Sequence, residues 1–292
     1  MTRRAMVFAF AVLALACGGS PEAITTCEDA PGMHPICGFQ NPEDLAVLPG
    51  GKALLVSQFG AMDGTKSGSL SVFFLDTESQ KPLFPAGGVG ATPEVASGPR
   101  WGDEDCPPPS AAFSPHGIDL AARPGGGLQL LVVNHGGRES IEMFEVIPDG
   151  ESASLEWRGC VLPPEEAFLN DIVALPDGGF LTTHMQPKRA GVAAFWQVVR
   201  GLLGFDTGHV YEWQPASGFR VVGGTQAPFP NGIEVSPDGS TIYLNVYLGS
   251  EVRRIDRRTG ELLAKADVPQ PDNVTWGDDG RLLVASHTAG LS

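Results

Sequence analysis

The chain has 292 residues, of which 38 are glycine, 25 are proline and only 18% are charged. Glycine and proline make up about a fifth of the chain, against a usual share of about 12%. This content of turn formers, with 42% apolar residues, excludes helical bundles, coiled coils and disordered chains. A net charge of −15 without any basic block excludes nucleic-acid binding.

The N-terminus carries the features of a targeting segment. Arg3 and Arg4 precede an apolar stretch, residues 5–16, which is shorter than the roughly 20 residues that span a bilayer. Cys17 follows this stretch at the cleavage position, so residues 1–17 are predicted to be a lipoprotein-type signal peptide with lipidation at Cys17. An ordinary secretory signal is the alternative. Both place the mature protein outside the cytoplasm, periplasmic or membrane-anchored in the first case and secreted in the second.

Four further cysteines follow the signal: Cys27, Cys37, Cys106 and Cys160. An even number of cysteines in an oxidising compartment predicts disulfides rather than a redox motif or a zinc site. Four cysteines allow three pairings. Cys106–Cys160 is favoured because both residues lie within the predicted fold.

A hairpin pattern recurs five times along the chain: an apolar strand, a turn of Pro, Asp and Gly, and a second apolar strand. The five segments begin at Asp44, Ile118, Asp171, Ile233 and Val274. Their turns, marked by residues 49, 124, 176, 237 and 278, are separated by steps of 75, 52, 61 and 41 residues. A period of about 40–50 residues, stretched by inserted loops, is typical of a β-propeller with one unit per blade.

The predicted fold is therefore all-β, a propeller over residues 39–292 after a tether of residues 18–38. The chain stops after the second strand of its fifth unit, which predicts a propeller truncated after the fifth blade begins. Residues 188–203 depart from the strand pattern, since apolar residues recur there at spacings of three, four and seven. This spacing predicts one inserted amphipathic helix.

Oxygen-bearing side chains occupy matching positions at the start of the repeated hairpins. They are Glu43, Asn170, Asn231 and Asp272, six residues before the turn marker, and Asp44, Asp171 and Asn273, five before it. The second unit has Ile118 there, which offers only its main-chain carbonyl. In a propeller such positions form a ring around the central channel. Burying this ring without a cation is costly, and hard oxygen ligands without cysteine favour Ca²⁺.

Four of the six histidines are predicted to lie at the same end of the channel. His116 and His135 are symmetric about the 124–127 turn, so they face each other across one hairpin. His184 and His287 end second strands that return to the face where the first strands begin. His34 and His209 are interpreted as packed or solvated residues. A His116–His135 pair beside a cation is a candidate proton relay.

The motifs NPEDLAVLPGG, SPHGIDL, LLVVNH, FLNDIVALP, PNGIEVSPDG and PDNVTWGDDG together resemble the paraoxonase/arylesterase family of six-bladed calcium-dependent propellers, within the wider gluconolactonase and senescence-marker group. The resemblance covers residues 41–287. It implies a catalytic calcium at Glu43, Asn170, Asn231, Asp272 and Asn273. It also implies a buried structural calcium at Asp44, Asp171 and the carbonyl of Ile118, and places the family's histidine pair on His116 and His135. His184 and His287 match further histidines of the substrate pocket.

The resemblance implies hydrolysis of a small-molecule lactone or ester. Calcium, assisted by the Asn170 amide, stabilises the oxyanion, while His116, tuned by His135, takes a proton from water. A water polarised by calcium, or Asp272 or Glu43 as the base, is the rival scheme. A sugar-lactone hydrolase of the gluconolactonase type and a non-catalytic calcium-stabilised binding module are the alternative functions. The helix of residues 188–203 is expected to cover the site and to dock on lipid, or else to pack on the propeller.

Overall fold

The computed structural model describes residues 27–29, 32, 34–61, 64–86 and 98–287. The chain divides into two compact units, one of Met1–Cys37 with Ala289–Ser292 and the other of Gly38–Thr288. Within the first unit, a disulfide joins Cys27 to Cys37. The predicted signal peptide and the lipidation site at Cys17 lie outside the described residues, and the boundaries predicted at residues 17 and 38 stay predictions.

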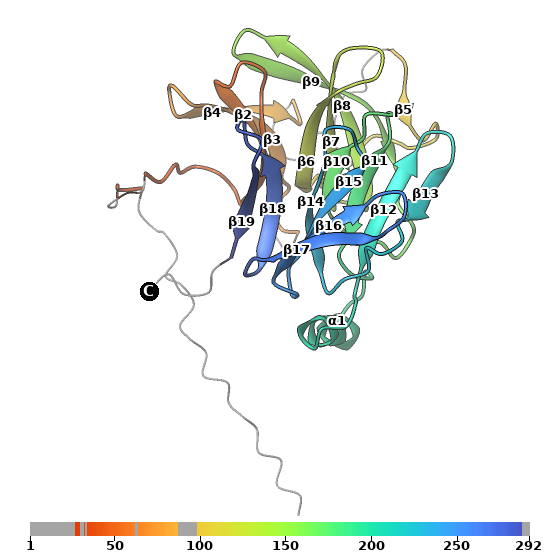
Figure 1. Ribbon diagram of the computed structural model, residues 1–292. Coiled ribbons are helices and arrows are strands. Elements are labelled where there is room, and N and C mark those ends of the chain that lie inside the picture. The colour runs from red at the N-terminus through yellow and green to blue at the C-terminus, as the bar shows by residue number, and fades with distance from the viewer. Residues whose placement is uncertain (1–26, 30–31, 33, 62–63, 87–97, 288–292) are drawn as a thin grey trace, which may run out of the picture. The chain divides into compact units, whose positions relative to one another are not determined.

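The second unit is an all-β propeller arrangement of radial sheets (Figure 1). The first sheet contains β1 (Pro42–Val47), β2 (Ala53–Gln58), β3 (Ser69–Phe74) and β4 (Ser79–Phe84). The second contains β5 (Trp101–Gly102), β6 (Pro115–Ala122), β7 (Leu128–Asn134), β8 (Ser140–Asp149) and β9 (Ser152–Val161). The third contains β10 (Leu169–Ala174), β11 (Phe180–His184), β12 (His209–Gln214) and β13 (Gly218–Val221). The fourth contains β14 (Pro230–Val235), β15 (Thr241–Val246), β16 (Glu251–Asp256) and β17 (Leu262–Asp267). The last described sheet pairs β18 (Pro271–Trp276) with β19 (Leu282–Ser286).

All five predicted hairpins are confirmed as antiparallel strand pairs: β1–β2, β6–β7, β10–β11, β14–β15 and β18–β19. Their tight turns need a left-handed backbone, which glycine supplies without steric cost. Gly178, Gly239 and Gly280 accordingly have φ angles of 92°, 69° and 73°. The short parallel strand β5 beside β9 was not predicted.

The hydrophobic core lies between neighbouring sheets, because alternate residues of each strand point to opposite faces. In β7, Leu130 packs with Leu55 of the first blade, whereas the next residue, Leu131, packs with Leu169 of the third. A separate cluster joins the third and fourth blades, with Leu181 against Ile233. The second and third blades are therefore each packed between two neighbours, which fixes their inner strands around the channel.

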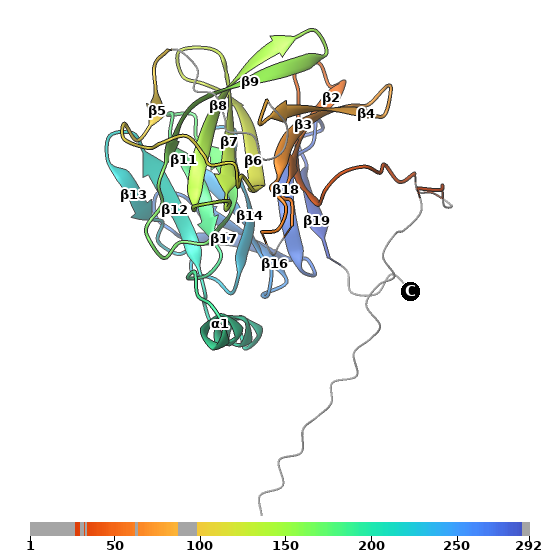
Figure 2. The ribbon, with the colours of Figure 1, turned by 180° about the vertical axis from the view of Figure 1, so that it is seen from behind.

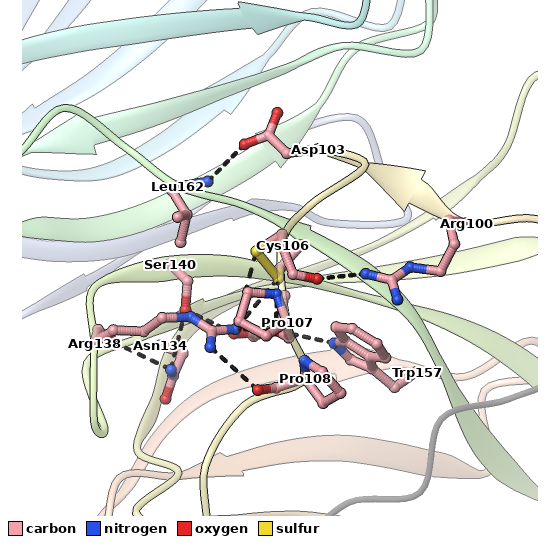
Figure 3. Close-up of a disulfide and its surroundings, with 12 residues drawn as sticks. Arg100, Asp103, Cys106, Pro107, Pro108, Asn134, Arg138, Ser140, Trp157 and Leu162 are labelled. Atoms are coloured by element: carbon pink, nitrogen blue, oxygen red, sulfur yellow. Dashed lines mark hydrogen bonds and ion pairs between the residues drawn. A yellow bond between two sulfur atoms is a disulfide. The ribbon is translucent and has the colours of Figure 1, made fainter.

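The favoured disulfide, Cys106–Cys160, is also confirmed and ties the segment before β6 to the end of β9. Figure 3 shows the Arg138 guanidinium beside this disulfide. Arg138 donates hydrogen bonds to the Pro107 carbonyl at 2.6 Å and to the buried Glu142 carboxylate at 2.9 Å. These contacts fix the loop between β7 and β8 to the rigid edge of its own blade. Two disulfides also agree with a location outside the cytoplasm.

The predicted helix is present but shorter, α1 (Val192–Leu202) rather than residues 188–203. Gly191 precedes it with φ 59°, a left-handed conformation that ends the helical pattern there. Within α1 only Gly201 is buried, and a side chain at this position would clash with Leu248 and Phe229. The rest of the helix stands apart from the sheets in both views (Figure 1 and Figure 2).

Candidate active site and metal centre

The inner strand of every blade has a break in its pairing near its first residues. The register shifts lie between Pro42 and Asp44, Pro115 and Ile118, Leu169 and Ile172, Pro230 and Ile233, and Pro271 and Val274. A β-bulge re-aims side chains that would otherwise alternate between the two faces of a strand. Because of the bulge, two consecutive residues, such as Asn170 and Asp171, can both be buried at the channel. The bulges therefore explain why the predicted ligands occur as adjacent pairs.

Two glycines let the inner strands approach one another closely at these bulges. A Cβ atom at Gly117 would lie 2.6 Å from Cα of Asp171, and one at Gly232 would lie 2.2 Å from the carbonyl oxygen of Asp272. Neighbouring backbones thus occupy the space that any side chain would need. Glycine in the SPHGIDL and PNGIEV segments is a packing requirement of the site.

Several side-chain oxygens at the end of the channel where the inner strands begin, called the mouth below, lack hydrogen-bond partners. Among the described residues, six buried side-chain oxygens have no hydrogen-bond partner. Four of them belong to Glu43, Asn170, Asn231 and Asn273, which are four of the five predicted ligands of the first calcium, and the other two belong to Asn245 and Gln186. Unsatisfied buried polar atoms are rare in native proteins because each one costs free energy. Their concentration at one place fits a cation as the absent partner. Within the described part of the chain, no three or more His, Cys, Asp or Glu side chains are grouped so that they could hold a metal.

The fifth predicted ligand, Asp272, lies in the same neighbourhood, where its negative charge acts on Glu43. Burial raises the pKa of Glu43 well above its usual value, and the charges of Asp44, Asp171 and Asp272 raise it further. Asn273 donates a hydrogen bond from its side chain to the Glu43 carbonyl at 2.9 Å, which joins β18 to β1. The first and last described blades therefore meet at this mouth.

The second predicted set forms a separate level of buried carboxylates. Asp44 accepts a hydrogen bond from the Ile118 amide at 2.7 Å, and Asp171 accepts one from the Ile233 amide at 2.8 Å. Burial raises the pKa of Asp44 to about 7 and that of Asp171 well above its usual value, with the Asp44 charge adding to the latter shift. Two buried carboxylates that repel each other fit a divalent cation between them.

His116 and His135 face each other as predicted, with their ring centroids 5.1 Å apart and nearly perpendicular. His116 Nδ1 lies 2.8 Å from the Asn170 carbonyl oxygen, and Nε2 lies 3.5 Å from Oε1 of Glu43. A carbonyl only accepts hydrogen bonds, so Nδ1 carries the hydrogen and Nε2 of the neutral ring is an acceptor. Burial, together with the nearby His135, lowers the pKa of His116 to about 3. His116 is therefore neutral at physiological pH.

The other two predicted histidines have different surroundings. His184 is buried, accepts a hydrogen bond from the Phe168 amide and packs 4.9 Å from His209. Burial lowers its pKa to about 4. His287 is exposed, with Nε2 3.2 Å from Asp272 and Nδ1 3.1 Å from the Tyr247 hydroxyl.

The remaining histidines, His34 and His209, match the interpretation as solvated and packed residues. His34 is largely exposed and pairs with Asp29. His209 packs against both His184 and Tyr211.

Sequence reasoning missed four polar residues near the channel. Asn245 is fully buried, its oxygen has no partner, and its nitrogen donates to the Asp272 carbonyl at 2.5 Å. Glu139 contacts His135 at 3.0 Å.

Asp119 and Glu234 line a channel cavity of about 520 Å³ together with Asp44 and Asp171. Burial raises the pKa of Asp119 to about 6 and that of Glu234 to about 8.

This chain is similar to several known proteins. The profile of the Arylesterase family matches residues 35–291. Human (Homo sapiens) serum paraoxonase/arylesterase 1 is 27% identical over 274 residues, which cover 90% of this chain and 71% of that protein. Among solved structures, a gluconolactonase from Xanthomonas campestris shares 17% identity, with a TM-score of 0.48 over 85% of this chain and 70% of the other. Regucalcin from Agrobacterium tumefaciens shares 16% identity, with a TM-score of 0.45 over 86% and 69%.

The fold is a propeller with buried polar side chains at the channel mouth and a pair of facing histidines. The family match covers most of the chain, so the protein belongs to the arylesterase family. Membership of this family indicates a hydrolase that acts on esters. The roles of single residues at the channel mouth are matters for the proposal below.

Proposed function

We propose that the protein is a calcium-dependent hydrolase of lactones and aryl esters. The observation that carries this proposal is the set of buried, unpartnered oxygens of Glu43, Asn170, Asn231 and Asn273 at the channel mouth. With Asp272 they would hold a catalytic calcium. Asp44, Asp171 and the Ile118 carbonyl would hold a second, structural calcium. Hard oxygen donors without sulfur are the ligands that Ca²⁺ prefers.

When bound, Ca²⁺ supplies a positive charge that stabilises the oxyanion formed at the substrate carbonyl. Asn170 belongs to both the ligand set and the catalytic set, since its amide lies beside the reacting carbonyl in this scheme. His116 presents an unprotonated Nε2 next to Glu43 and is therefore placed to take a proton from water. His135 lies against His116 and supports it. His184 and His287 line the substrate pocket.

Three side chains, His116, Glu43 and Asp272, are candidates for the general base. His116 is neutral and oriented, but its low pKa makes it a weak base, whereas Glu43 is 3.5 Å away and has a raised pKa. Asp272 is a third candidate. Replacing His116 by Gln removes the ring while keeping a polar group. A large fall in kcat would identify His116 as the base. A fall of less than about threefold would mean that Glu43 or Asp272 is the base.

The experiment that tests the function is an assay of purified protein on phenyl acetate, aliphatic lactones and sugar lactones, with Ca²⁺ and with chelator. Hydrolysis of the first two that is lost in chelator and restored by Ca²⁺ supports the proposal. Turnover of sugar lactones alone would favour the gluconolactonase alternative. No turnover of any of these substrates would favour the non-catalytic binding module. The His116–His135 contact favours an enzyme, since a binding module needs no such pair.

The ring is proposed to have six blades, of which β1–β19 form four and the start of a fifth. Elsewhere the apolar faces of blades cover one another, but Leu45 and Leu283 are 55% and 56% exposed and line one cavity of about 340 Å³. A sixth blade between β19 and β1 would cover them. Hydrogen exchange in β1 and β19 is the measurement, and protection as strong as in β7 would argue against an open edge.

A lipid surface is the proposed partner of α1, in addition to the lipid anchor proposed at Cys17. Phe195, Trp196 and Leu202 are 63%, 57% and 66% exposed on the helix, and Arg200 adds positive charge. Such a helix suits the interface of a bilayer. No helix in the described part of the chain is long and apolar enough to cross a membrane. Sedimentation with phosphatidylglycerol vesicles should fall when Phe195 and Trp196 are both replaced by Ser, with esterase activity retained.

A further inference from the structure

Glu139 contacts His135, one of the two residues of the histidine pair. His135 and Glu139 are four residues apart, at the two ends of the turn between β7 and β8. His135 Nδ1 is 3.0 Å from the Glu139 carboxylate, and both side chains are only 9% exposed. A carboxylate only accepts, so Nδ1 of His135 carries a hydrogen in this contact.

Both oxygens of the Glu139 carboxylate have further donors. The Leu169 amide, at the start of β10, donates to Oε1 at 2.7 Å. The Lys188 ammonium, in the segment before α1, lies 3.3 Å from Oε2. These donors hold the Glu139 carboxylate in one place. Glu139 is thus fixed by the next blade as well as by its own turn.

The turn that carries Glu139 is itself anchored. The preceding residue, Arg138, contacts the Cys106–Cys160 disulfide and the Pro107 carbonyl (Figure 3). His135 is enclosed by aromatic rings, with Phe168 at 4.7 Å and Phe59 at 5.8 Å between centroids. These rings restrict the position of the imidazole plane but not which ring nitrogen bears the hydrogen. Among the contacts of His135 with described residues, the one with Glu139 determines that choice.

We propose that Glu139 is a positioning residue that holds His135 in the tautomer with hydrogen on Nδ1, leaving Nε2 as the acceptor. This inference rests on the proposed function, since the oriented imidazole matters because it abuts His116. Glu139 acts through His135 and touches no substrate. Its loss should therefore lower kcat and leave KM nearly unchanged. Misplacement of a general base or its support typically costs about 10–100-fold.

The experiment compares Glu139→Gln with a matched control, Glu166→Gln. Glu166 also forms an ion pair through its carboxylate, but its partner is the exposed Arg189 rather than a histidine. We expect E139Q to lower kcat on phenyl acetate about 10–100-fold at unchanged KM, and E166Q to change neither by more than about twofold. Glu139→Asp, which keeps the carboxylate, should recover part of the lost kcat.

The second readout is ring ¹⁵N NMR of the histidines, which separates protonated from bare nitrogens without any turnover. In the wild type, His135 should show hydrogen on Nδ1, and E139Q should shift the balance towards Nε2. A wild-type His135 with hydrogen on Nε2 alone overturns the proposal, even if a variant fails to fold. E139Q with wild-type kcat and an unchanged tautomer also overturns it. If the wild type has no esterase activity, the proposed function fails, while the NMR result still decides the role of Glu139.

Discussion

The pKa values of carboxylates are shifted in opposite directions at the two ends of the propeller strands. At the turn end, Asp177 accepts hydrogen bonds from Gln214, the Gly179 amide and Arg257, and these donors lower its pKa despite some burial. At the mouth, burial and mutual repulsion raise the pKa of Glu43 and Asp44. The same residue type recurs at a fixed place in the repeat at both ends. At the turn end the donors outweigh burial, whereas at the mouth the Ile118 and Leu45 amides that donate to Asp44 do not.

This difference separates a structural use of carboxylates from a functional one. An aspartate in a tight turn satisfies local amides and costs the fold nothing. A buried carboxylate beside unpartnered amide oxygens destabilises the fold unless a ligand compensates it. The mouth therefore carries a cost that a bound cation would remove, and this asymmetry can be measured.

The largest expected effect is a reversal of the pH dependence of stability by calcium. Asp44 has a usual pKa of 3.8 and a folded-state pKa of about 7. Because the pKa of Asp44 is raised in the folded state, protonation of Asp44 stabilises the fold. This contribution to the free energy of unfolding is complete below pH 3.8 and is lost as the pH rises to about 7. In chelator, the free energy of unfolding should fall by an amount on the order of 4 kcal/mol across this window.

Bound Ca²⁺ reverses this trend because it favours the charged carboxylates. Urea denaturation at pH 5 and pH 7.5, each with Ca²⁺ and with chelator, is the measurement. We expect strong stabilisation by Ca²⁺ at pH 7.5 and little at pH 5. Equal stabilisation at both pH values would mean that the mouth carboxylates do not bind the ion.

The next effect concerns catalysis. Replacing Asn231 by Leu keeps the approximate shape of the side chain but removes the unpartnered oxygen at the mouth. Loss of a residue that supports a metal ligand can lower activity about 100-fold. Loss of the ligand itself should lower the rate by at least as much. Initial rates on phenyl acetate at saturating Ca²⁺ measure it. Wild-type rates in Asn231→Leu would remove Asn231 from the proposed ligand set.

The same variant should have the opposite effect on the metal-free fold. Asn231 is 5% exposed and its oxygen has no partner, so its burial is unfavourable without a cation. Leu at this position should raise the free energy of unfolding in chelator by about 1 kcal/mol. A destabilisation in chelator would show that the Asn231 oxygen has a partner within the protein, and the functional interpretation of the mouth would weaken.

The sequence was sufficient to predict the features that repeat along the chain. The Pro-Asp-Gly turns located all five hairpins, and the distance of His116 and His135 from their common turn predicted that they face each other. Glu139 was missed because its contact with His135 depends on the irregular path of the 135–139 turn, which no period describes. Asn245 was missed because a single polar residue inside a strand resembles an ordinary surface position. The start of α1 was wrong because residues 188–191 were included although the apolar spacing begins only at Val192, and the left-handed backbone of Gly191 cannot be helical.

The smallest effect should come from the turn end, which serves as the control for the other predictions. Asp177→Asn keeps the size of the side chain and the acceptor for the Gly179 amide but removes the charge facing Arg257. Asp177 is half exposed, and exposed ion pairs contribute about 0–1 kcal/mol. We expect a loss of stability below about 1 kcal/mol, unchanged esterase activity and an unchanged response to Ca²⁺. If D177N altered the calcium response as much as Asn231→Leu does, the ion would act on the whole propeller, and the distinction between the two ends would not hold.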